Sequence, residues 1–268
     1  MGLDTVAPLH LHARSFGHGP EPALALHCSL AHSGAWRGVA GALAEDMTVT
    51  ALDLPSHGRS PDWDGQGDIT DATVAAVRPF LGRPMHLIGH SYGGVIALRL
   101  AVQYPHLVKS VSLFEPVLMA VAREDGPEQA AWNAALMQTV MTEIAAGHPD
   151  RAARAFMRVW GDGRRWDDLP EDLRAGATRR ITVIRDSEPS LGHDNWGLIP
   201  RLGEIQAPLV LMDGAESPAL MKVVQDGIAA RVHGARRKTF EGLAHMGPIT
   251  HPKTVAAEIL QNVRRAEG

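Results

Sequence analysis

The pattern with the clearest chemical meaning is a serine between two glycines, in the sequence Gly-His-Ser-Tyr-Gly at 89–93. The apolar run at 85–88 predicts a short buried strand before it, and apolar residues at helical spacing predict a helix over 95–104. A turn this sharp between a strand and a helix strains the backbone at the serine and exposes its hydroxyl, while the two glycines stand where a Cβ would clash. We therefore expect Ser91 to act as a nucleophile.

A histidine near the end of the chain can supply the base that such a serine needs. A serine hydroxyl is a poor nucleophile until a base takes its proton, and an imidazole can do so near neutral pH when an acid holds its tautomer. His245 follows the last expected strand, at 237–240, in a loop at 242–247 that can fold over the carboxyl edge of a sheet. We expect His245 to be the base.

Three segments together resemble the α/β-hydrolase superfamily. They are the serine turn, the sequence Asp-Leu-Pro-Ser-His-Gly-Arg-Ser at 53–60 and the sequence Gly-Leu-Ala-His-Met-Gly-Pro at 242–248, in the superfamily's order and spacing. The resemblance covers nearly the whole chain and implies an α/β-hydrolase fold, with a mostly parallel central sheet and flanking helices. It also places His245 where the superfamily carries its base, and we expect the 53–60 loop to be structural.

The same resemblance assigns two backbone N–H groups to an oxyanion hole. A loop at 27–36 follows the strand expected at 23–27, and the corresponding superfamily loop donates one N–H, which matches Ser29. The second donor is the N–H of Tyr92, the residue after the nucleophile. Cys28 stands where glycine is usual in this loop, and we expect it to be a small buried hydrophobe.

The acid that orients the histidine is harder to place. Most superfamily members carry Asp three residues after the glycine that follows the strand expected at 208–212, but Ser217 stands there. Glu115 ends the strand after the nucleophile helix, where catalytic groups gather at the carboxyl edge of a parallel sheet and where relatives resembling haloalkane dehalogenases carry their acid. We expect Glu115 to be the acid, with Asp213 and Glu216 as alternatives that remain open.

Strand and helix patterns lie on both sides of one long helical stretch. A strand at 108–114 completes a strand-helix-strand unit with the nucleophile helix, which indicates a parallel sheet. From 116 to 200 no strand pattern occurs, and we expect an α/β core domain formed by 1–115 and 201–268 with a helical cap inserted at 116–200. The helices expected in the cap are 128–146, 151–159 and 171–186; the other expected elements are strands at 9–16 and 48–52 and helices at 68–81, 219–230 and 254–264.

Five tryptophans are candidates for the substrate pocket. Trp36 lies in the loop that carries Ser29, where it either lines the pocket or begins the next helix. The cap holds four of the six tryptophans of the chain, and apolar rings on a lid suit an apolar substrate. These four are Trp132, Trp160, Trp166 and Trp196, and each could instead fasten the cap to the core domain.

Composition narrows the classes of partner and cofactor. The 268 residues carry a net charge of −4 with both signs intermixed, so there is no basic stripe for nucleic acid. A single cysteine rules out a disulfide framework and a thiolate metal cluster, and the 14 histidines show no metal-ligand spacing such as His-Glu-x-x-His. The amino terminus, at 1–8, lacks a signal-peptide pattern, and no apolar run reaches transmembrane length. We expect a cytoplasmic enzyme without a metal, cofactor, nucleic-acid or membrane partner.

The nucleophile also separates the possible reactions. Superfamily members that displace halide or open epoxides attack with Asp, so Ser91 disfavours dehalogenation. We expect attack by serine on a small-molecule carboxylic ester or lactone, followed by hydrolysis of the acyl-enzyme. A C–C bond hydrolase or a cofactor-free perhydrolase could use the same residues, and a small-molecule receptor on a hydrolase scaffold would keep them without fast turnover. The sequence leaves the oligomeric state open.

Overall fold

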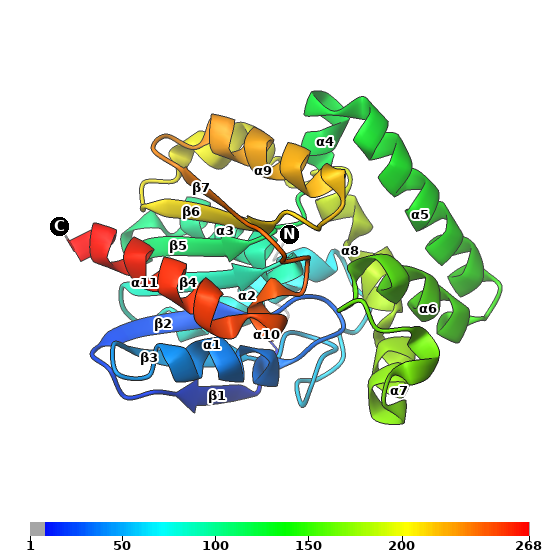
Figure 1. Ribbon diagram of the computed structural model, residues 1–268, viewed down its shortest axis with the longest axis horizontal. Helices are drawn as coiled ribbons and strands as arrows, with labels where there is room; N and C mark the ends of the chain where they lie inside the picture. The colour runs from blue at the N-terminus through cyan, green and yellow to red at the C-terminus, as the bar shows by residue number, and fades with distance from the viewer. Residues whose placement is uncertain (1–8, 268) are drawn as a thin grey trace, which may run out of the picture.

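A computed structural model describes residues 9–267, and its centre is a seven-stranded sheet (Figure 1). The strands are β1 (Ala13–Phe16), β2 (Glu21–Leu26), β3 (Met47–Leu52), β4 (Met85–His90), β5 (Val108–Phe114), β6 (Leu209–Gly214) and β7 (Arg236–Phe240). Their order across the sheet is β1-β3-β2-β4-β5-β6-β7, with β1 antiparallel to β3 and every other pair parallel. The parallel strands bring their carboxyl ends to one edge, which confirms the mostly parallel sheet expected from the sequence.

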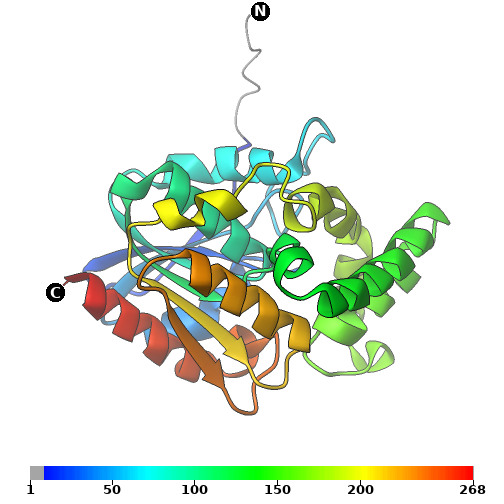
Figure 2. The same ribbon diagram turned by 90° about the horizontal axis from the view of Figure 1, so that it is seen from above.

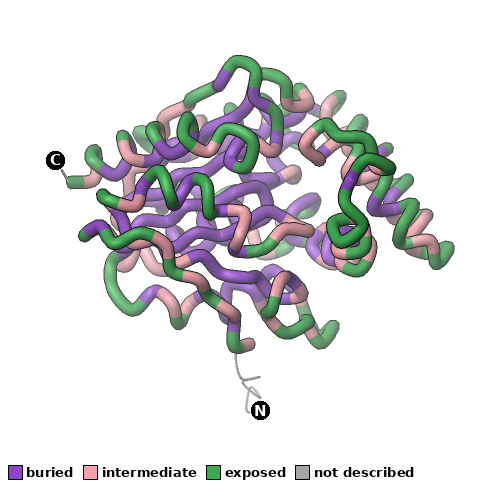
Figure 3. Tube along the Cα trace, turned by 60° about the horizontal axis from the view of Figure 1, so that its bottom comes forward, coloured by how far each residue is buried: buried purple, intermediate pink, exposed green. Residues whose placement is uncertain are grey.

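Helices cover both faces of the sheet because side chains alternate between the faces along each buried strand (Figures 1 and 2). One face carries α1 (Arg37–Ala42) and α11 (Pro252–Glu267), and the other carries α2 (Ile69–Val77), α3 (Tyr92–Gln103) and α9 (Ala219–Arg231). Along β2, Leu24 and Leu26 pack with the second set of helices, whereas Ala23 and Ala25 pack with the first. Figure 3 shows the strands as the buried interior of the molecule.

The chain between β5 and β6 forms helices and short 3₁₀ turns, and no strand occurs in this fully described stretch. The helices are α4 (Ala120–Asp125), α5 (Pro127–Ala145), α6 (Pro149–Trp160), α7 (Glu171–Arg180) and α8 (Thr182–Leu191). Figure 1 shows α5, α6 and α7 beyond the carboxyl ends of the strands, where they share a small apolar cluster that includes Val140, Ala152 and Ile181. The division into a core domain and a cap at 116–200 stays a prediction.

Two expected elements differ from the structure. The single helix expected at 171–186 is wrong, because α7 and α8 meet at Ile181. Ile181 keeps helical dihedral angles (φ −60°, ψ −25°), so no helix-breaking residue marks the junction in the sequence. The strand expected at 9–16 begins only at Ala13, because its partner β3 ends at Leu52, opposite Ala13. The stretch 1–8, where we expect no signal peptide, lies outside the described residues.

Candidate active site

The turn between β4 and α3 holds Ser91 in a strained backbone conformation. Ser91 has φ 55° and ψ −116°, at the positive φ that favours glycine. A Cβ on Gly89 would lie 2.7 Å from the Cα of Gly94, and a Cβ on Gly93 would collide with the carbonyl oxygen of Leu26. Both glycines therefore let the chain approach itself around the serine, as the motif predicts.

The close approach at Gly93 joins the serine turn to the loop after β2. Gly93 N–H donates to the carbonyl of His27 at 3.1 Å, and Ser29 and Ser91 line the same cavities. Within residues 9–267, neither Ser29 N–H nor Tyr92 N–H donates a hydrogen bond, and Tyr92 is the first residue of α3. Free N–H groups beside a serine, one of them at a helix N-terminus, can bind an oxyanion.

Two buried histidines hold the backbone of the loop after β2 on either side of the free N–H of Ser29. His27 Nδ1–H donates to the carbonyl of Cys28 at 2.7 Å, and His57 Nε2 accepts the N–H of Leu30 at 3.0 Å. The other ring nitrogens bond the backbone of the 53–60 loop, which sets both rings as neutral imidazoles with the proton on Nδ1. Burial lowers the pKa of His27 to about 4 and the pKa of His57 to about 3, so neither ring carries charge near neutral pH.

Asp53 ties the same two loops together. Its carboxylate accepts the N–H of Ser33 at 2.6 Å and the N–H of Arg59 at 2.8 Å. Burial acts to raise the pKa of Asp53, but its hydrogen bonds outweigh burial and hold the pKa below its usual value. Gly58, with φ 56°, passes so close to the carboxylate that a Cβ there would collide with it. The contacts of Asp53 are therefore structural.

Glu115 and His245 meet at the carboxyl edge of the sheet. Glu115 follows β5, and its Oε2 lies 2.6 Å from Nδ1 of His245, in the loop after β7. Glu115 is fully buried, and His245 lines the same cavities as Ser91. Glu115 has a φ of 46°, so it leaves its strand through a strained turn, as Ser91 does. No hydrogen bond joins Ser91 Oγ to His245 within residues 9–267, and such contacts commonly tighten only when substrate binds.

The two alternative acids lie away from this histidine. Asp213 accepts hydrogen bonds from Arg237 at 2.8 Å and from Thr239 at 3.1 Å. Burial raises the pKa of Asp213, against the opposing effect of the arginine. Glu216 is exposed. In the part of the chain that the structure describes, neither carboxylate forms a hydrogen bond or an ion pair with His245.

Ser217, at the position where the resemblance of the sequence leads us to expect an acid, contacts Glu115. Its hydroxyl donates to Oε1 of Glu115 at 2.6 Å, and the N–H of Gly214 donates to the same oxygen at 2.9 Å. One carboxylate oxygen is thus held by residues at the end of β6, while the other faces His245. These bonds fix the orientation of the carboxylate toward the imidazole.

His90 holds the loop that carries His245, a role that the motifs in the sequence do not predict. His90 Nε2–H donates to the backbone carbonyl of His245 at 2.8 Å, and the two rings lie 5.0 Å apart. Burial, followed by the neighbouring His245, lowers the pKa of His90 well below its usual value, so this ring is neutral. The signal in the sequence is its place next to the nucleophile, where a side chain cannot lie far from the site.

Two cavities meet at Ser91. The α8 cavity has a volume of about 50 Å³ and is lined mainly by α5, α6 and α8, while the loop cavity has a volume of about 250 Å³ and is lined by the loop after β2 together with α6 and α7. The side chains that line both are Ser29, Ser91, Phe156, Trp160 and His245. A substrate with two arms extending from one reacting carbon could therefore place one arm in each cavity.

Trp160 is the one predicted pocket tryptophan that lines these two cavities. Its ring stands edge-on to the ring of His245, with the centroids 4.9 Å apart. Trp132 packs behind it, at 6.4 Å between ring centroids, and is 44% exposed. Trp160 therefore packs against the ring of His245 in a wall that the two cavities share.

The other three tryptophans lie elsewhere, and each has a packing or surface role. Trp36 is buried in the apolar cluster beneath α1 and α11. Trp166 lines a separate surface cavity beside α6. Trp196 lies between the guanidinium groups of Arg99 and Arg201, which are 4.2 Å and 4.6 Å from its ring centroid.

Cys28 is a small buried side chain, as expected. Burial raises the pKa of its thiol to about 12, so the thiol stays protonated and unreactive. The positive φ in this loop falls on Leu30, at 66°, rather than on Cys28. A residue other than glycine is therefore tolerated at this position without backbone strain.

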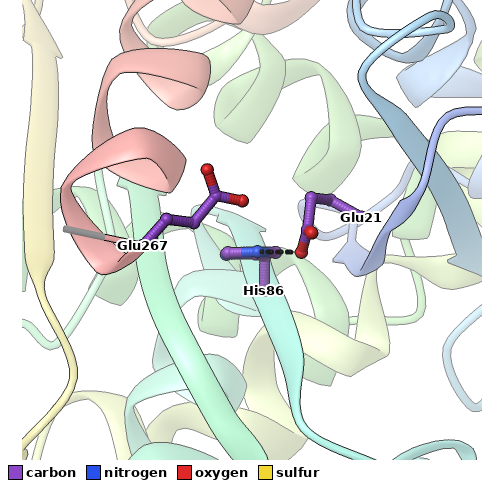
Figure 4. Close-up of side chains that lie close together, drawn as sticks. All are labelled: Glu21, His86 and Glu267. Carbon is purple, nitrogen blue, oxygen red and sulfur yellow. Dashed lines mark hydrogen bonds and ion pairs between the residues drawn. The ribbon is translucent and has the colours of Figure 1, made fainter.

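One group of side chains outside this site has the spacing of a metal site (Figure 4). Ligand atoms of Glu21, His86 and Glu267 lie within 4.8 Å of one another, near the amino ends of β2 and β4 and thus far along the strands from Ser91. Lys109 donates to the Glu21 carboxylate, and both ring nitrogens of His86 are hydrogen-bonded. Because an ammonium group already neutralises Glu21, we interpret the group as a structural ion-pair network.

A known protein family matches most of this chain. The match is to the alpha/beta hydrolase family, over residues 23–258. The chain belongs to the α/β-hydrolase family. Lipase LipV of Mycobacterium tuberculosis is 31% identical over 273 residues, covering 94% of this chain and 97% of the relative. A pimeloyl-[acyl-carrier protein] methyl ester esterase of Nitrosomonas europaea is 33% identical over 253 residues, covering 91% and 95%. These relatives identify this α/β hydrolase as an esterase-type enzyme.

Solved structures of α/β hydrolases share its fold. The enol-lactonase from Burkholderia xenovorans LB400 superposes with a TM-score of 0.68 at 18% identity, covering 96% of this chain and 97% of the other. MenH from S. aureus superposes with a TM-score of 0.73 at 15% identity, covering 96% and 99%. Among residues 9–267 of this α/β hydrolase, no helix combines the length and apolar character that crossing a membrane requires.

Proposed function

We propose that this α/β hydrolase is a serine hydrolase that cleaves a small or medium carboxylic ester or lactone through an acyl-enzyme. The observation that carries the proposal is the 2.6 Å contact of His245 Nδ1 with Glu115 Oε2, beside cavities that Ser91 also lines. A base oriented by an acid next to a strained serine is the arrangement of a Ser-His-acid triad. The names of the two relatives, a lipase and a methyl ester esterase, agree with an ester substrate.

Glu115 gives His245 its orientation and its tautomer. Because the carboxylate accepts the Nδ1–H, the lone pair of Nε2 is free to take the proton of Ser91 Oγ. The serine oxygen then attacks the carbonyl carbon, and the buried carboxylate stabilises the imidazolium that has formed.

The oxyanion of the tetrahedral intermediate lies between the N–H groups of Ser29 and Tyr92 in this mechanism. Both groups are without a hydrogen-bond acceptor within residues 9–267. His27 and His57 already fix the loop around the first donor, so binding the oxyanion requires little reorganisation. Each such donor typically contributes roughly a hundredfold to a thousandfold in rate.

Collapse of the intermediate releases the alcohol and leaves the acyl group on Ser91. The alcohol oxygen takes its proton from His245, which then activates a water molecule to hydrolyse the acyl-enzyme. Cavities of about 50 Å³ and 250 Å³ suit a small or medium substrate. We expect these steps to need no cofactor and to take place in the cytoplasm.

Labelling with a fluorophosphonate tests this proposal. We expect a single adduct on Ser91 by peptide mass spectrometry, together with turnover of p-nitrophenyl esters. Ser91→Ala should lose both while keeping the circular dichroism spectrum, because this small side chain contributes little to packing. Ser15→Ala, on the edge strand β1, is the matched control and should keep both. Tight ligand binding without turnover in the wild type would indicate a receptor instead.

A further inference from the structure

The α8 cavity ends at two polar side chains that the proposed triad does not use. Its wall is mostly apolar, and includes Val117, Met119, Met137, Ile184 and Leu191. Asn133 of α5 and Glu188 of α8 line it as well. Together with Met119, these two side chains also line a neighbouring cavity that Ser91 does not line, so they mark the end away from the nucleophile.

Neither polar side chain has a hydrogen-bond partner. Within residues 9–267, no group donates to the Glu188 carboxylate, and the side-chain amide of Asn133 makes no hydrogen bond. His193 Nε2 is 3.8 Å from Glu188 Oε1, which is beyond hydrogen-bond distance. Burial raises the pKa of Glu188, although His193 and Arg123 act in the opposite direction. The Glu188 side chain is 27% exposed and its ion pair with His193 is long, so a ligand group in the cavity can provide the hydrogen bonds that this carboxylate lacks.

The side chains around the neighbouring cavity leave the Glu188 carboxylate free to bind a ligand group. This cavity has a volume of about 30 Å³, and Arg123 and Gly192 line it together with Asn133 and Glu188. Arg123 is engaged with the ring of His193 at 3.1 Å rather than with the carboxylate. The absence of a side chain at Gly192 leaves the space that the Glu188 carboxylate occupies.

We propose that Glu188 and Asn133 recognise a hydroxyl or primary ammonium group at the far end of the substrate's acyl chain. The inference rests on the proposed ester hydrolysis at Ser91 and narrows its substrates to ω-hydroxyacyl and ω-aminoacyl esters. The carboxylate accepts hydrogen bonds from the terminal group, and the Asn133 amide adds a further polar contact. The apolar wall between this pair and Ser91 covers the methylene groups of the chain.

The acyl chain suits the α8 cavity better than the alcohol does. The alcohol leaves when the acyl-enzyme forms, so it needs a way out, and the loop cavity is the larger of the two, at about 250 Å³ against about 50 Å³. The acyl chain stays attached to Ser91 until water arrives. A narrow cavity that holds the chain in place favours that second step.

The chemistry of the pair also excludes other terminal groups. A carboxylate at the end of the chain would lie beside the Glu188 carboxylate, and like charges repel. A terminal methyl group would remove water from Glu188 and Asn133 without replacing its hydrogen bonds, which is unfavourable. The cavity therefore prefers a hydrogen-bond donor to both alternatives.

A matched set of methyl esters tests the proposal. Straight-chain acids from butanoic to octanoic, each ending in a methyl, hydroxyl, amino or carboxyl group, are compared by kcat/KM. At one chain length or more, we expect the hydroxyl or amino ester to exceed the unsubstituted ester by about tenfold. The carboxyl ester should show no such gain.

Variants of Glu188 and Asn133 test whether these side chains cause the preference for a terminal hydroxyl or amino group. Glu188→Gln and Asn133→Leu should each bring the ratio of hydroxyl to unsubstituted ester down toward one. Asp186→Asn removes a carboxylate from the same helix but outside both cavities, so it should keep the wild-type ratio. A wild-type ratio of one or below at every chain length overturns the proposal, as does a ratio that neither variant lowers. A preference found only when the hydroxyl group is on the alcohol overturns the assignment to the acyl chain.

Binding to the Ser91→Ala variant separates this proposal from the proposed function. Calorimetry with the hydroxyl and unsubstituted methyl esters measures recognition without turnover, and we expect Kd values that differ by about tenfold. If the wild type hydrolyses no ester but this preference in binding remains, the proposed function fails while the recognition site stands. Equal binding of the two esters, with turnover intact in the wild type, overturns the recognition site alone.

Discussion

Ser217 donates its hydroxyl to Oε1 of Glu115 at 2.6 Å, while the other oxygen of that carboxylate lies 2.6 Å from Nδ1 of His245. Ser217, where the resemblance of the sequence leads us to expect an acid, thus supports a carboxylate that follows the neighbouring strand. The exchange is possible because β5 and β6 pair in parallel, so Glu115 and Ser217 both lie just beyond the carboxyl ends of adjacent strands.

Glu115→Gln should lower kcat by roughly a hundredfold to ten-thousandfold. The change keeps the size of the side chain but removes its charge, and it can favour the wrong tautomer of His245. Turnover of p-nitrophenyl butyrate is the measurement, with the melting temperature as a check on folding. Asp213→Asn and Glu216→Gln are the matched controls, and each should cost less than about tenfold, since neither side chain contacts His245. A crippling effect of Asp213→Asn would assign the acid to β6 instead.

The sequence predicts that Ser91 and His245 lie at the same edge of the sheet, because both follow the ends of strands. Ser91 and His245 come from motifs tied to strand ends, and parallel pairing then brings their loops to one edge of the sheet. The roles of His27, His57 and His90 were not predictable, because each ring forms a hydrogen bond with a backbone group that is distant in the sequence. Spacing along the chain does not encode such contacts.

Stability should fall as the pH is lowered from about 6.5 toward 4, because of His27 and His57. Burial holds the pKa of His27 at about 4 and the pKa of His57 at about 3, against an ordinary value of 6.5. Between these values the unfolded chain binds protons that the folded chain does not, so the free energy of unfolding decreases as pH falls. The loss should be on the order of 2–3 kcal/mol for each histidine.

Urea denaturation between pH 7 and about pH 4 measures this loss. His57→Gln keeps a group that can accept the N–H of Leu30 but cannot titrate, so its free energy of unfolding should depend less steeply on pH than that of the wild type. The free energy of unfolding of the variant should still depend on pH in part, because burial also lowers the pKa of His86 and the pKa of His90. Identical slopes in the wild type and the variant would count against a depressed pKa at His57.

Trp160→Leu should change the preference for acyl chain length, by about tenfold or more in the ratio of kcat/KM for butyrate and octanoate esters. The ring lines both cavities and stands 4.9 Å from the ring of His245, so a smaller side chain enlarges the space next to the reacting carbon. Trp166→Leu is the control, because its ring lines a separate cavity. A preference that Trp160→Leu leaves unchanged would reduce Trp160 to a packing residue.

The four tryptophans at 116–200 show why the sequence does not rank candidate pocket residues. All four lie on helical segments or their connections, and composition alone gives each the same claim to the pocket. Trp196 instead lies between Arg99 and Arg201, and its ring also packs against the apolar cluster on one face of the sheet. The difference comes from how α6 and the 196–201 segment pack on the core, which is decided by contacts between elements far apart in the sequence.

A carboxylate placed at 217 should partly replace Glu115. Because Ser217 Oγ lies 2.6 Å from the Glu115 carboxylate, Asp at this position would bring a charge close to His245 Nδ1. The double variant Glu115→Gln/Ser217→Asp should therefore recover about tenfold or more of the kcat that Glu115→Gln loses. Ser217→Asp alone should lower the melting temperature, because it sets a second carboxylate beside the buried Glu115, and like charges repel. If the double variant is no more active than Glu115→Gln, a carboxylate at 217 cannot replace one at 115.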